Sequence, residues 1–99
     1  MAGTIPIVMN EQKLRFEARV NDDTGYIDYR WYKGSLALLH IFVPMEGRGK
    51  GVPEALAEFA LEYARQRKLK VMVYCSYIAK YIKQHPEYEH LKDERYHQK

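Results

Sequence analysis

The chain contains a single cysteine among its 99 residues, so an internal disulfide is impossible. A lone cysteine is typical of proteins from a reducing compartment, and we expect this protein to be cytoplasmic. No apolar run approaches the roughly 18–20 residues that a helix needs to cross a bilayer. The first residues have neither the charged region nor the apolar region of a secretory signal. These absences argue against a membrane-spanning helix and against secretion.

The chain also has little excess of one charge. Sixteen basic and thirteen acidic residues leave a formal charge of +3, which is too weak an excess to demand a nucleic-acid partner. His85, His90 and His97 are irregularly spaced and match no carboxylate pattern, so we expect no metal site. An apolar fraction of 46% and nine tyrosines do indicate a folded core. The length predicts one small domain over residues 1–99.

The first half of the chain predicts an antiparallel meander of three or four strands. Residues 14–20 alternate cleanly between apolar and polar side chains, which is typical of a half-buried strand, and residues 5–9 alternate more weakly. Residues 26–32 are rich in strand-favouring aromatic side chains. Residues 35–43 form an apolar strand. Turn-forming residues separate these segments.

A glycine loop and a helix follow the apolar strand. The loop reads Gly47-Arg48-Gly49-Lys50-Gly51, and Pro53 then stands in the first turn of a helix predicted over residues 52–68. Helix N-termini attract anions, and glycines let the backbone approach a phosphate closely. The loop therefore predicts a phosphate site, although a tight turn with solvated basic residues fits the same pattern. Its spacing matches neither the P-loop nor the dinucleotide-binding fingerprint.

The second half of the chain predicts two helices joined by a strand. The first helix carries an apolar stripe that we expect to pack on the sheet: Leu56, Phe59, Ala60, Tyr63 and Ala64. A buried strand over residues 70–74 should lie parallel to the strand before the loop, because a helix connects the two. A second helix is expected over residues 76–84. The charged tail should have Leu91 as its one aliphatic anchor and fray at its end.

These elements predict an α+β fold with a mostly antiparallel sheet. The helix over residues 52–68 connects two strands that should be parallel, and it should pack on the sheet as in an α/β fold.

Several short motifs stand around the glycine loop. Residues 48–53 read Arg-Gly-Lys-Gly-Val-Pro, and the motifs on either side are His40, Val43-Pro44, Cys75-Ser76-Tyr77 and His85-Pro86. Together these resemble the GNAT acetyltransferase superfamily, and more narrowly its small single-domain (YjdJ-type) members. The acyl-CoA signature of the family is Arg or Gln, two residues, Gly, one residue, then Gly or Ala. Pro53 departs from the last position and removes one amide donor.

The resemblance runs from about residue 16 to residue 88 and implies the second half of the GNAT fold. It also implies that acetyl-CoA is the cosubstrate. The coenzyme's pyrophosphate would lie on the glycine loop, at Gly47, Arg48, Gly49, Lys50, Gly51 and Val52. Its pantetheine arm would lie between the parallel strands and pair like an added strand with His40, Ile41, Phe42 and Val43, close to Cys75.

Two mechanisms of N-acetyl transfer are open at this point. In direct transfer, His40 is the candidate base because imidazole titrates near neutral pH, and Tyr81 is the candidate acid by its resemblance to the family's tyrosine. In the other mechanism, Cys75 accepts the acetyl group first, since a helix N-terminus favours the thiolate form. Purely structural roles as a packed histidine and a small buried thiol fit the same residues.

Three functions compete on the sequence alone. The first is an N-acetyltransferase of unknown amine acceptor, the second an acyl-CoA-binding module with little catalysis, and the third a small nucleic-acid-binding domain that uses the basic loop and tyrosines. The chain lacks the acceptor-side helices usual in the family. Its acceptor pocket is therefore either open or completed by a partner, for which a homodimer is one candidate.

Overall fold

The computed structural model describes residues 5–20, 22–47 and 49–97. Its strands are β1 (Ile7–Asn10), β2 (Arg15–Val20), β3 (Asp23–Tyr32), β4 (Ser35–Phe42) and β5 (Val71–Val73). Its helices are α1 (Val52–Gln66) and α2 (Ser76–Gln84), with 3-10 helices η1 (Met45–Gly47) and η2 (Pro86–Leu91). Each predicted strand and helix is present, and α2 has the predicted bounds.

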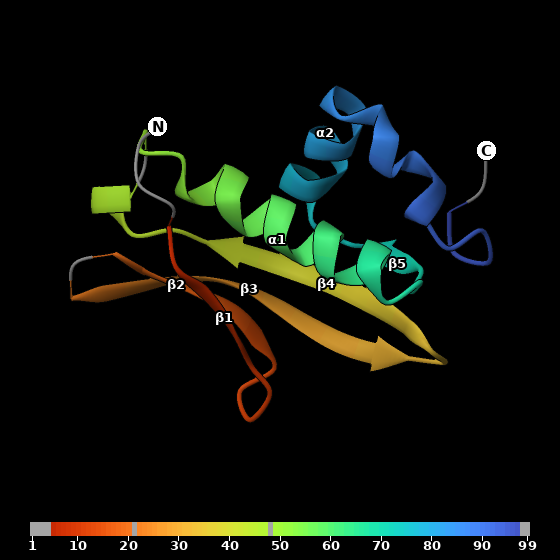
Figure 1. The fold of residues 1–99 in the computed structure, drawn as a ribbon, viewed down its shortest axis with the longest axis horizontal. Helices are drawn as coiled ribbons and strands as arrows, with labels where there is room; N and C mark the ends of the chain where they lie inside the picture. Colours follow the sequence, from red (N-terminus) through yellow and green to blue (C-terminus); the bar gives the residue numbers. More distant parts are fainter. Residues whose placement is uncertain (1–4, 21, 48, 98–99) are drawn as a thin grey trace.

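The five strands form one sheet in the order β1-β2-β3-β4-β5. The first three pairs are antiparallel, and β4 pairs with β5 in parallel. The helix α1 connects these two parallel strands, and α1, α2 and η2 all lie on one side of the sheet (Figure 1). The predicted α+β fold, mostly antiparallel with one parallel pair after the crossover helix, is confirmed.

The core lies between the sheet and α1. Alternate residues of the central strands point toward α1 and are fully buried, among them Phe16, Ile27 and Tyr29. The helix contributes a buried stripe of six residues: Val52, Leu56, Ala57, Ala60, Leu61 and Ala64.

The buried stripe of α1 differs from the predicted one. Phe59 is 37% exposed and Tyr63 is half-buried, whereas Ala57 and Leu61 are fully buried. The reason is that α1 contacts α2 and η2 as well as the sheet, so its buried side is turned toward the C-terminal helices. The predicted end of the helix at residue 68 is two residues too late. Lys68 adopts a left-handed conformation (φ 58°), which stops the helix.

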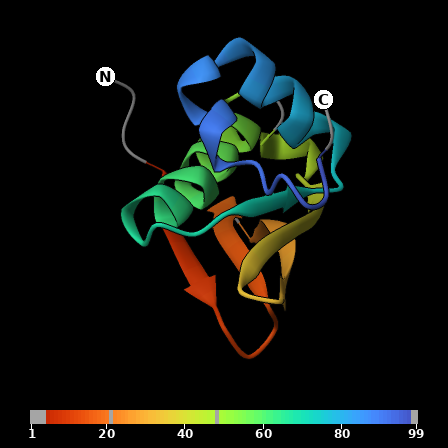
Figure 2. The same cartoon turned by 90° about the vertical axis from the view of Figure 1, so that its right-hand side faces the viewer.

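The C-terminal segment packs along β5 (Figure 2). The N–H group of Asp93 donates to the carbonyl oxygen of Val71 at 2.8 Å, and the N–H group of Val73 donates to Nε2 of His97 at 2.8 Å. Leu91 is buried as predicted, but Tyr88 and Asp93 are buried with it. The segment up to His97 is therefore an integral part of the fold.

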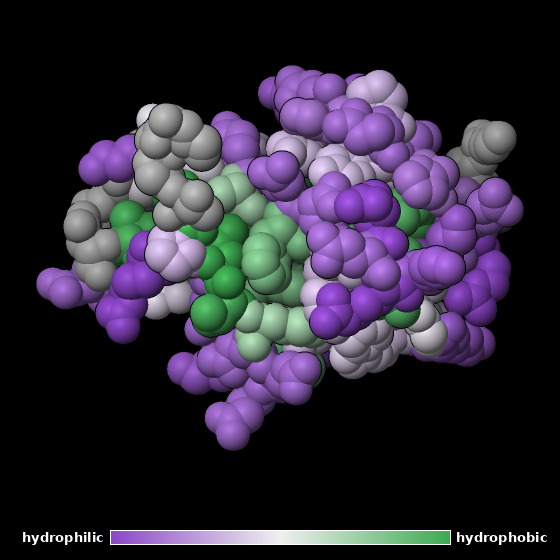
Figure 3. Space-filling view, viewed as in Figure 1, coloured by the Kyte–Doolittle hydropathy of each residue, from purple (hydrophilic) through white to green (hydrophobic). Residues whose placement is uncertain are grey.

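One face of the molecule is divided between two kinds of surface. Hydrophobic residues gather around β1 and the adjoining part of α1, whereas hydrophilic residues cover η2 (Figure 3). Within the described ranges, no helix is both long enough and apolar enough to span a membrane.

Candidate functional site

The strands β4 and β5 separate halfway along β4. Their described pairing ends at Leu38 and Val73, followed by a hydrogen bond from the N–H group of Tyr74 to the carbonyl oxygen of Leu38 at 2.9 Å. β4 then continues for four more residues to Phe42. On its other side, β4 pairs with β3, where Asp28 pairs with His40 and the next residue, Tyr29, pairs with Leu38. Leu39 is therefore an extra, bulged residue in β4. A bulge bends its strand, and β4 beyond the bulge has no described pairing with β5.

The glycine loop follows directly, between the end of β4 and α1. Gly49 and Gly51 have φ values of 81° and 83°, and a Cβ atom added at either would meet nothing within 4 Å. Both glycines and Lys50 are exposed, so the loop backbone is open to a ligand. Gly47 has a different role, because a Cβ there would lie 3.0 Å from a methyl group of Val43. It is a buried packing position.

Some amides of the predicted phosphate site are already engaged. The N–H group of Gly47 donates to the carbonyl oxygen of Pro44 at 2.9 Å, and that of Lys50 donates to the carbonyl oxygen of Gly47 at 3.3 Å. Arg48, also predicted to bind the pyrophosphate, lies outside the described residues. The helix α1 begins after Gly51 without a hydrogen bond from a capping side chain. The start of α1 thus presents its dipole to the loop region, while Pro53 contributes no donor.

Cys75 lies on the helix side of the sheet, two residues after the end of β5. It is the N-cap residue of α2 and is 8% exposed. Cys75 belongs to the hydrophobic core, which also contains Val43, just after β4, and Val52 from the start of α1. Cys75 is therefore a buried residue at the junction of β5 and α2.

Two tyrosines of α2 lie beside this junction. Burial raises the pKa of Tyr77 to about 12, and the charge of the Glu54 carboxylate and a hydrogen bond with it act in the same direction. Burial also raises the pKa of Tyr81, with the charges of Glu58 and Glu87 adding to the effect. Both hydroxyls therefore stay protonated at neutral pH. The sequence motif contained Tyr77, but only the fold shows that it meets Glu54 in the first turn of α1.

His40 lies on the opposite face of the sheet. Ile27 pairs with Ile41 on the core side, so the next pair, Asp28 and His40, points to the uncovered side. The His40 side chain is 63% exposed, and its Nδ1 atom is 4.0 Å from a carboxylate oxygen of Asp28. The sequence did not suggest Asp28, because the cross-strand register that places it beside His40 depends on the bulge.

The three predicted catalytic residues therefore lie on two different faces of the sheet. Cys75 and Tyr81 belong to the same buried cluster under the helices, and His40 comes from the uncovered face. Among the described residues, no group of three or more His, Cys, Asp or Glu side chains is arranged to hold a metal ion.

Comparison with known proteins identifies related chains. The family model of the GCN5-related N-acetyl-transferase matches residues 15–91. Protein NATD1 from Mus musculus is 33% identical over 87 residues, covering 85% of this chain and 79% of the relative. Protein NATD1 from Homo sapiens is 32% identical over 85 residues, covering 83% of this chain and 75% of the relative.

A solved structure supports the fold. The solution structure of a GCN5-like protein from Staphylococcus aureus superimposes on this chain over 100% of both chains, with a TM-score of 0.65. The sequences are 19% identical, so this similarity concerns the fold alone. The family model, in contrast, matches most of the present sequence. The chain therefore belongs to the GCN5-related N-acetyltransferase family, the GNAT superfamily that its motifs predict.

Proposed function

We propose that this protein transfers the acetyl group of acetyl-CoA to the nitrogen atom of an amine. The observation that carries the proposal is the separation of β4 and β5 directly beside an open glycine loop and the start of α1. Membership of the GNAT family supports it. The loop would bind the pyrophosphate of the coenzyme, and the strand separation would bind its pantetheine arm.

The glycine loop suits the pyrophosphate of the coenzyme. Gly49 and Gly51 leave open space where any other residue would carry a Cβ atom, so the phosphates can approach the backbone. The exposed ammonium group of Lys50 supplies positive charge, and Arg48 is proposed from the sequence alone. Since the N–H groups of Gly47 and Lys50 bond within the loop, donors must come from the other amides of the loop and from the first turn of α1.

The strand separation suits the pantetheine arm. Beyond Leu38, β4 has no described pairing with β5, and amide groups of the arm would take the place of a strand there. Ile41 and Phe42 are the proposed contacts. Val43 is buried and would form the wall of the channel with Cys75.

The chain has the side chains that such a transfer needs. Acetyl-CoA supplies an activated thioester: the nitrogen–carbon bond forms, the carbon–sulfur bond breaks, the amine loses a proton and the sulfur gains one. His40 is the proposed acceptor of the amine proton, held near Asp28 on the uncovered face. Tyr81 is the proposed donor to the sulfur, from the helix side. Cys75 as an intermediate carrier of the acetyl group is the alternative.

Calorimetric titration with acetyl-CoA tests the proposal. We expect saturable binding, and its absence near about 1 mM ligand would reject any acyl-CoA function, leaving the nucleic-acid hypothesis. A thiol-release assay over a panel of amines then separates an enzyme from a binding module without catalysis. A native mass spectrum of the purified protein would detect retained coenzyme and would also show whether the protein is a homodimer.

A further inference from the structure

A pocket of about 490 Å³ opens beside β5, outside the coenzyme site proposed above. Its lining includes Tyr32 at the end of β3, Lys33 in the turn that follows, Tyr74 just after β5, and Asp93, Arg95 and Tyr96 from the C-terminal segment. Met72 completes the lining. The volume falls within the range of about 300–1,000 Å³ that is usual for sites of small molecules.

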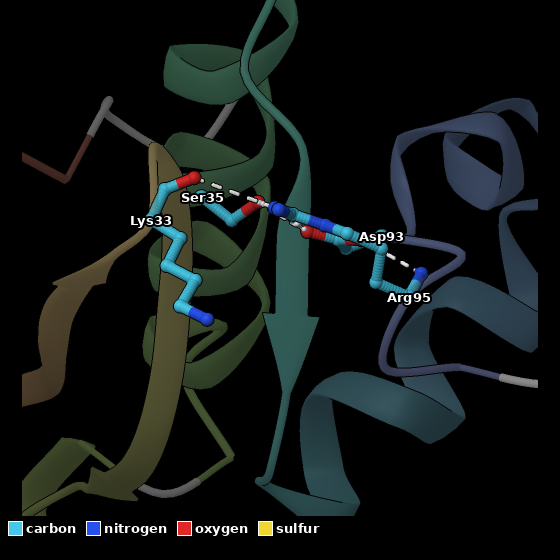
Figure 4. Close-up of polar contacts among 4 residues, drawn as sticks. All are labelled: Lys33, Ser35, Asp93 and Arg95. Carbon is cyan, nitrogen blue, oxygen red and sulfur yellow. Dashed lines mark hydrogen bonds and ion pairs between the residues drawn. The ribbon is translucent and has the colours of Figure 1, made fainter.

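Asp93 connects the C-terminal segment to the start of β4 at the pocket (Figure 4). Its buried carboxylate accepts a hydrogen bond from the hydroxyl of Ser35 and two from the guanidinium of Arg95, at 2.8 Å from Nη2 and 3.2 Å from Nε. The backbone N–H group of Arg95 donates a third, at 2.9 Å. These bonds hold the pKa of Asp93 well below its usual range. The acidic side chain of the pocket is therefore ionised and already paired, so it is a poor partner for a cationic ligand.

The two cations of the pocket still have donors to offer. Arg95 uses Nε and Nη2 for Asp93, Ser35 and the carbonyl oxygen of Lys33, and among the described residues no bond involves its Nη1. The ammonium group of Lys33 lies 5.5 Å from the centre of the Tyr32 ring, and within the described part of the chain it has no carboxylate partner. A guanidinium edge and an ammonium group without partners favour an anion.

The tyrosines of the pocket favour a planar group. Tyr32, Tyr74 and Tyr96 are 53%, 50% and 41% exposed, which is high for aromatic side chains that could have packed in the core. The rings of Tyr74 and Tyr96 lie 4.7 Å apart and tilted by 43°. Such rings supply stacking surface and polar hydroxyl tips.

The pocket reaches the strand separation at Tyr74. The N–H group of this residue makes the hydrogen bond to Leu38 at which β4 and β5 part. Val73 points into the core, so strand alternation directs Tyr74 to the uncovered face, where His40 also lies. A molecule in the pocket thus lies on the same side as the proposed base.

We propose that this pocket binds the acceptor, an amine joined through a planar ring to a carboxylate. The carboxylate is held by Arg95 and Lys33, the ring lies among the three tyrosines, and the amine extends past Tyr74 toward the strand separation. Repulsion by the two cations keeps an ammonium group at that far end. The acceptor role rests on the function proposed above, whereas binding of the molecule does not.

The test uses 4-(aminomethyl)benzoate as the probe and 4-(aminomethyl)benzamide, its uncharged analogue, as the matched ligand. Each is titrated into the isotope-labelled protein, and backbone amide shifts are followed by NMR. We expect the benzoate to shift Lys33, Met72, Tyr74 and Tyr96, and to bind about three- to fivefold more tightly than the benzamide.

A pair of variants tests the charge. Lys33 and Lys68 are both exposed lysines with positive φ, of 50° and 58°, and Lys68, just after α1, is not among the residues that line the pocket. Lys33→Gln should reduce the preference for the benzoate, because only Arg95 then remains to hold the carboxylate, and Lys68→Gln should leave it unchanged. Equal affinity for the two ligands, shifts elsewhere in the protein, or an unaltered preference in Lys33→Gln would overturn the proposal.

A separate titration with acetyl-CoA keeps the two proposals distinguishable. If the benzoate binds in the pocket and acetyl-CoA does not bind, the pocket is a ligand site and the acetyltransferase proposal fails. If acetyl-CoA binds and the benzoate does not, the acceptor class is wrong and the acetyltransferase proposal stands.

Discussion

Val73 and His97 are joined by a hydrogen bond in which the backbone N–H group donates to the imidazole Nε2 atom at 2.8 Å. Only an unprotonated nitrogen can accept this bond. Burial lowers the pKa of His97 from its usual 6.5, and Lys92 acts in the same direction against the opposing carboxylates of Asp93 and Glu89. The attachment of the C-terminal segment to β5 therefore depends on pH.

The sign of this dependence follows from the lowered pKa. The folded chain holds the His97 proton less tightly than the unfolded chain, so the stabilisation is complete above pH 6.5 and is lost as the pH falls below it. We expect the hydrogen-exchange protection factor of the Val73 amide to fall between about pH 7.5 and pH 5. The Tyr74 amide, which donates to Leu38 instead, is the control and should keep its protection. A parallel loss at both amides would contradict the assignment.

Tyr29 and Tyr88 should respond oppositely to removal of the hydroxyl group. The hydroxyl of Tyr29 is a buried polar atom for which the described residues supply no partner, whereas that of Tyr88 donates to a Glu62 carboxylate oxygen at 2.8 Å. Tyr29→Phe should change the free energy of unfolding by less than about 0.5 kcal/mol or increase it, and Tyr88→Phe should lower it by about 1–3 kcal/mol. Urea denaturation measures both. A large loss in Tyr29→Phe would show that its hydroxyl has a partner.

A side chain at Gly49 should obstruct the coenzyme. A valine there meets no protein atom near its Cβ, so its effect on a ligand is direct, and we expect about tenfold weaker binding of acetyl-CoA. Gly34→Val is the matched control, because Gly34 also has a positive φ (85°) and open space around it. Both variants carry the same backbone strain. Calorimetry giving equal affinities for the two would place the phosphate site elsewhere.

Replacement of Cys75 separates the two mechanisms. If the thiol carries the acetyl group, Cys75→Ala and Cys75→Ser should both bind acetyl-CoA normally and lose turnover in the thiol-release assay. The serine variant nearly preserves the volume of this buried side chain, so it separates packing from chemistry. Turnover retained in the serine variant would leave direct transfer as the mechanism.

Replacement of His40 tests the proposed base. We expect His40→Gln to lower kcat by about a hundredfold while the affinity for acetyl-CoA is unchanged, since the exposed ring supports little of the core. His90→Gln, at another exposed histidine, is the control. An equal kcat in the two variants would exclude His40.

The sequence alone indicated most of the elements because their signals are local. The alternation in residues 14–20, the loop glycines and the proline after α2 each act within a few residues of the structure they specify. The family was also identifiable from short motifs, although the narrower assignment to the small YjdJ-type members stays a prediction. Local signals fix where a strand or helix forms, and they say little about what it contacts.

Tertiary structure decided which residues are buried, paired or bulged, because these features depend on contacts between residues far apart in the chain. Leu61 and not Phe59 is buried in α1, since the C-terminal helices turn the buried side toward themselves. Asp93, in a tail that looked solvated, becomes buried because Ser35 lies beside it across 58 positions of sequence. The bulge at Leu39 and the separation of β4 from β5 depend on the register of three strands. No single segment carries the information for such pairings, because each depends on which distant groups the fold brings into hydrogen-bonding and packing range.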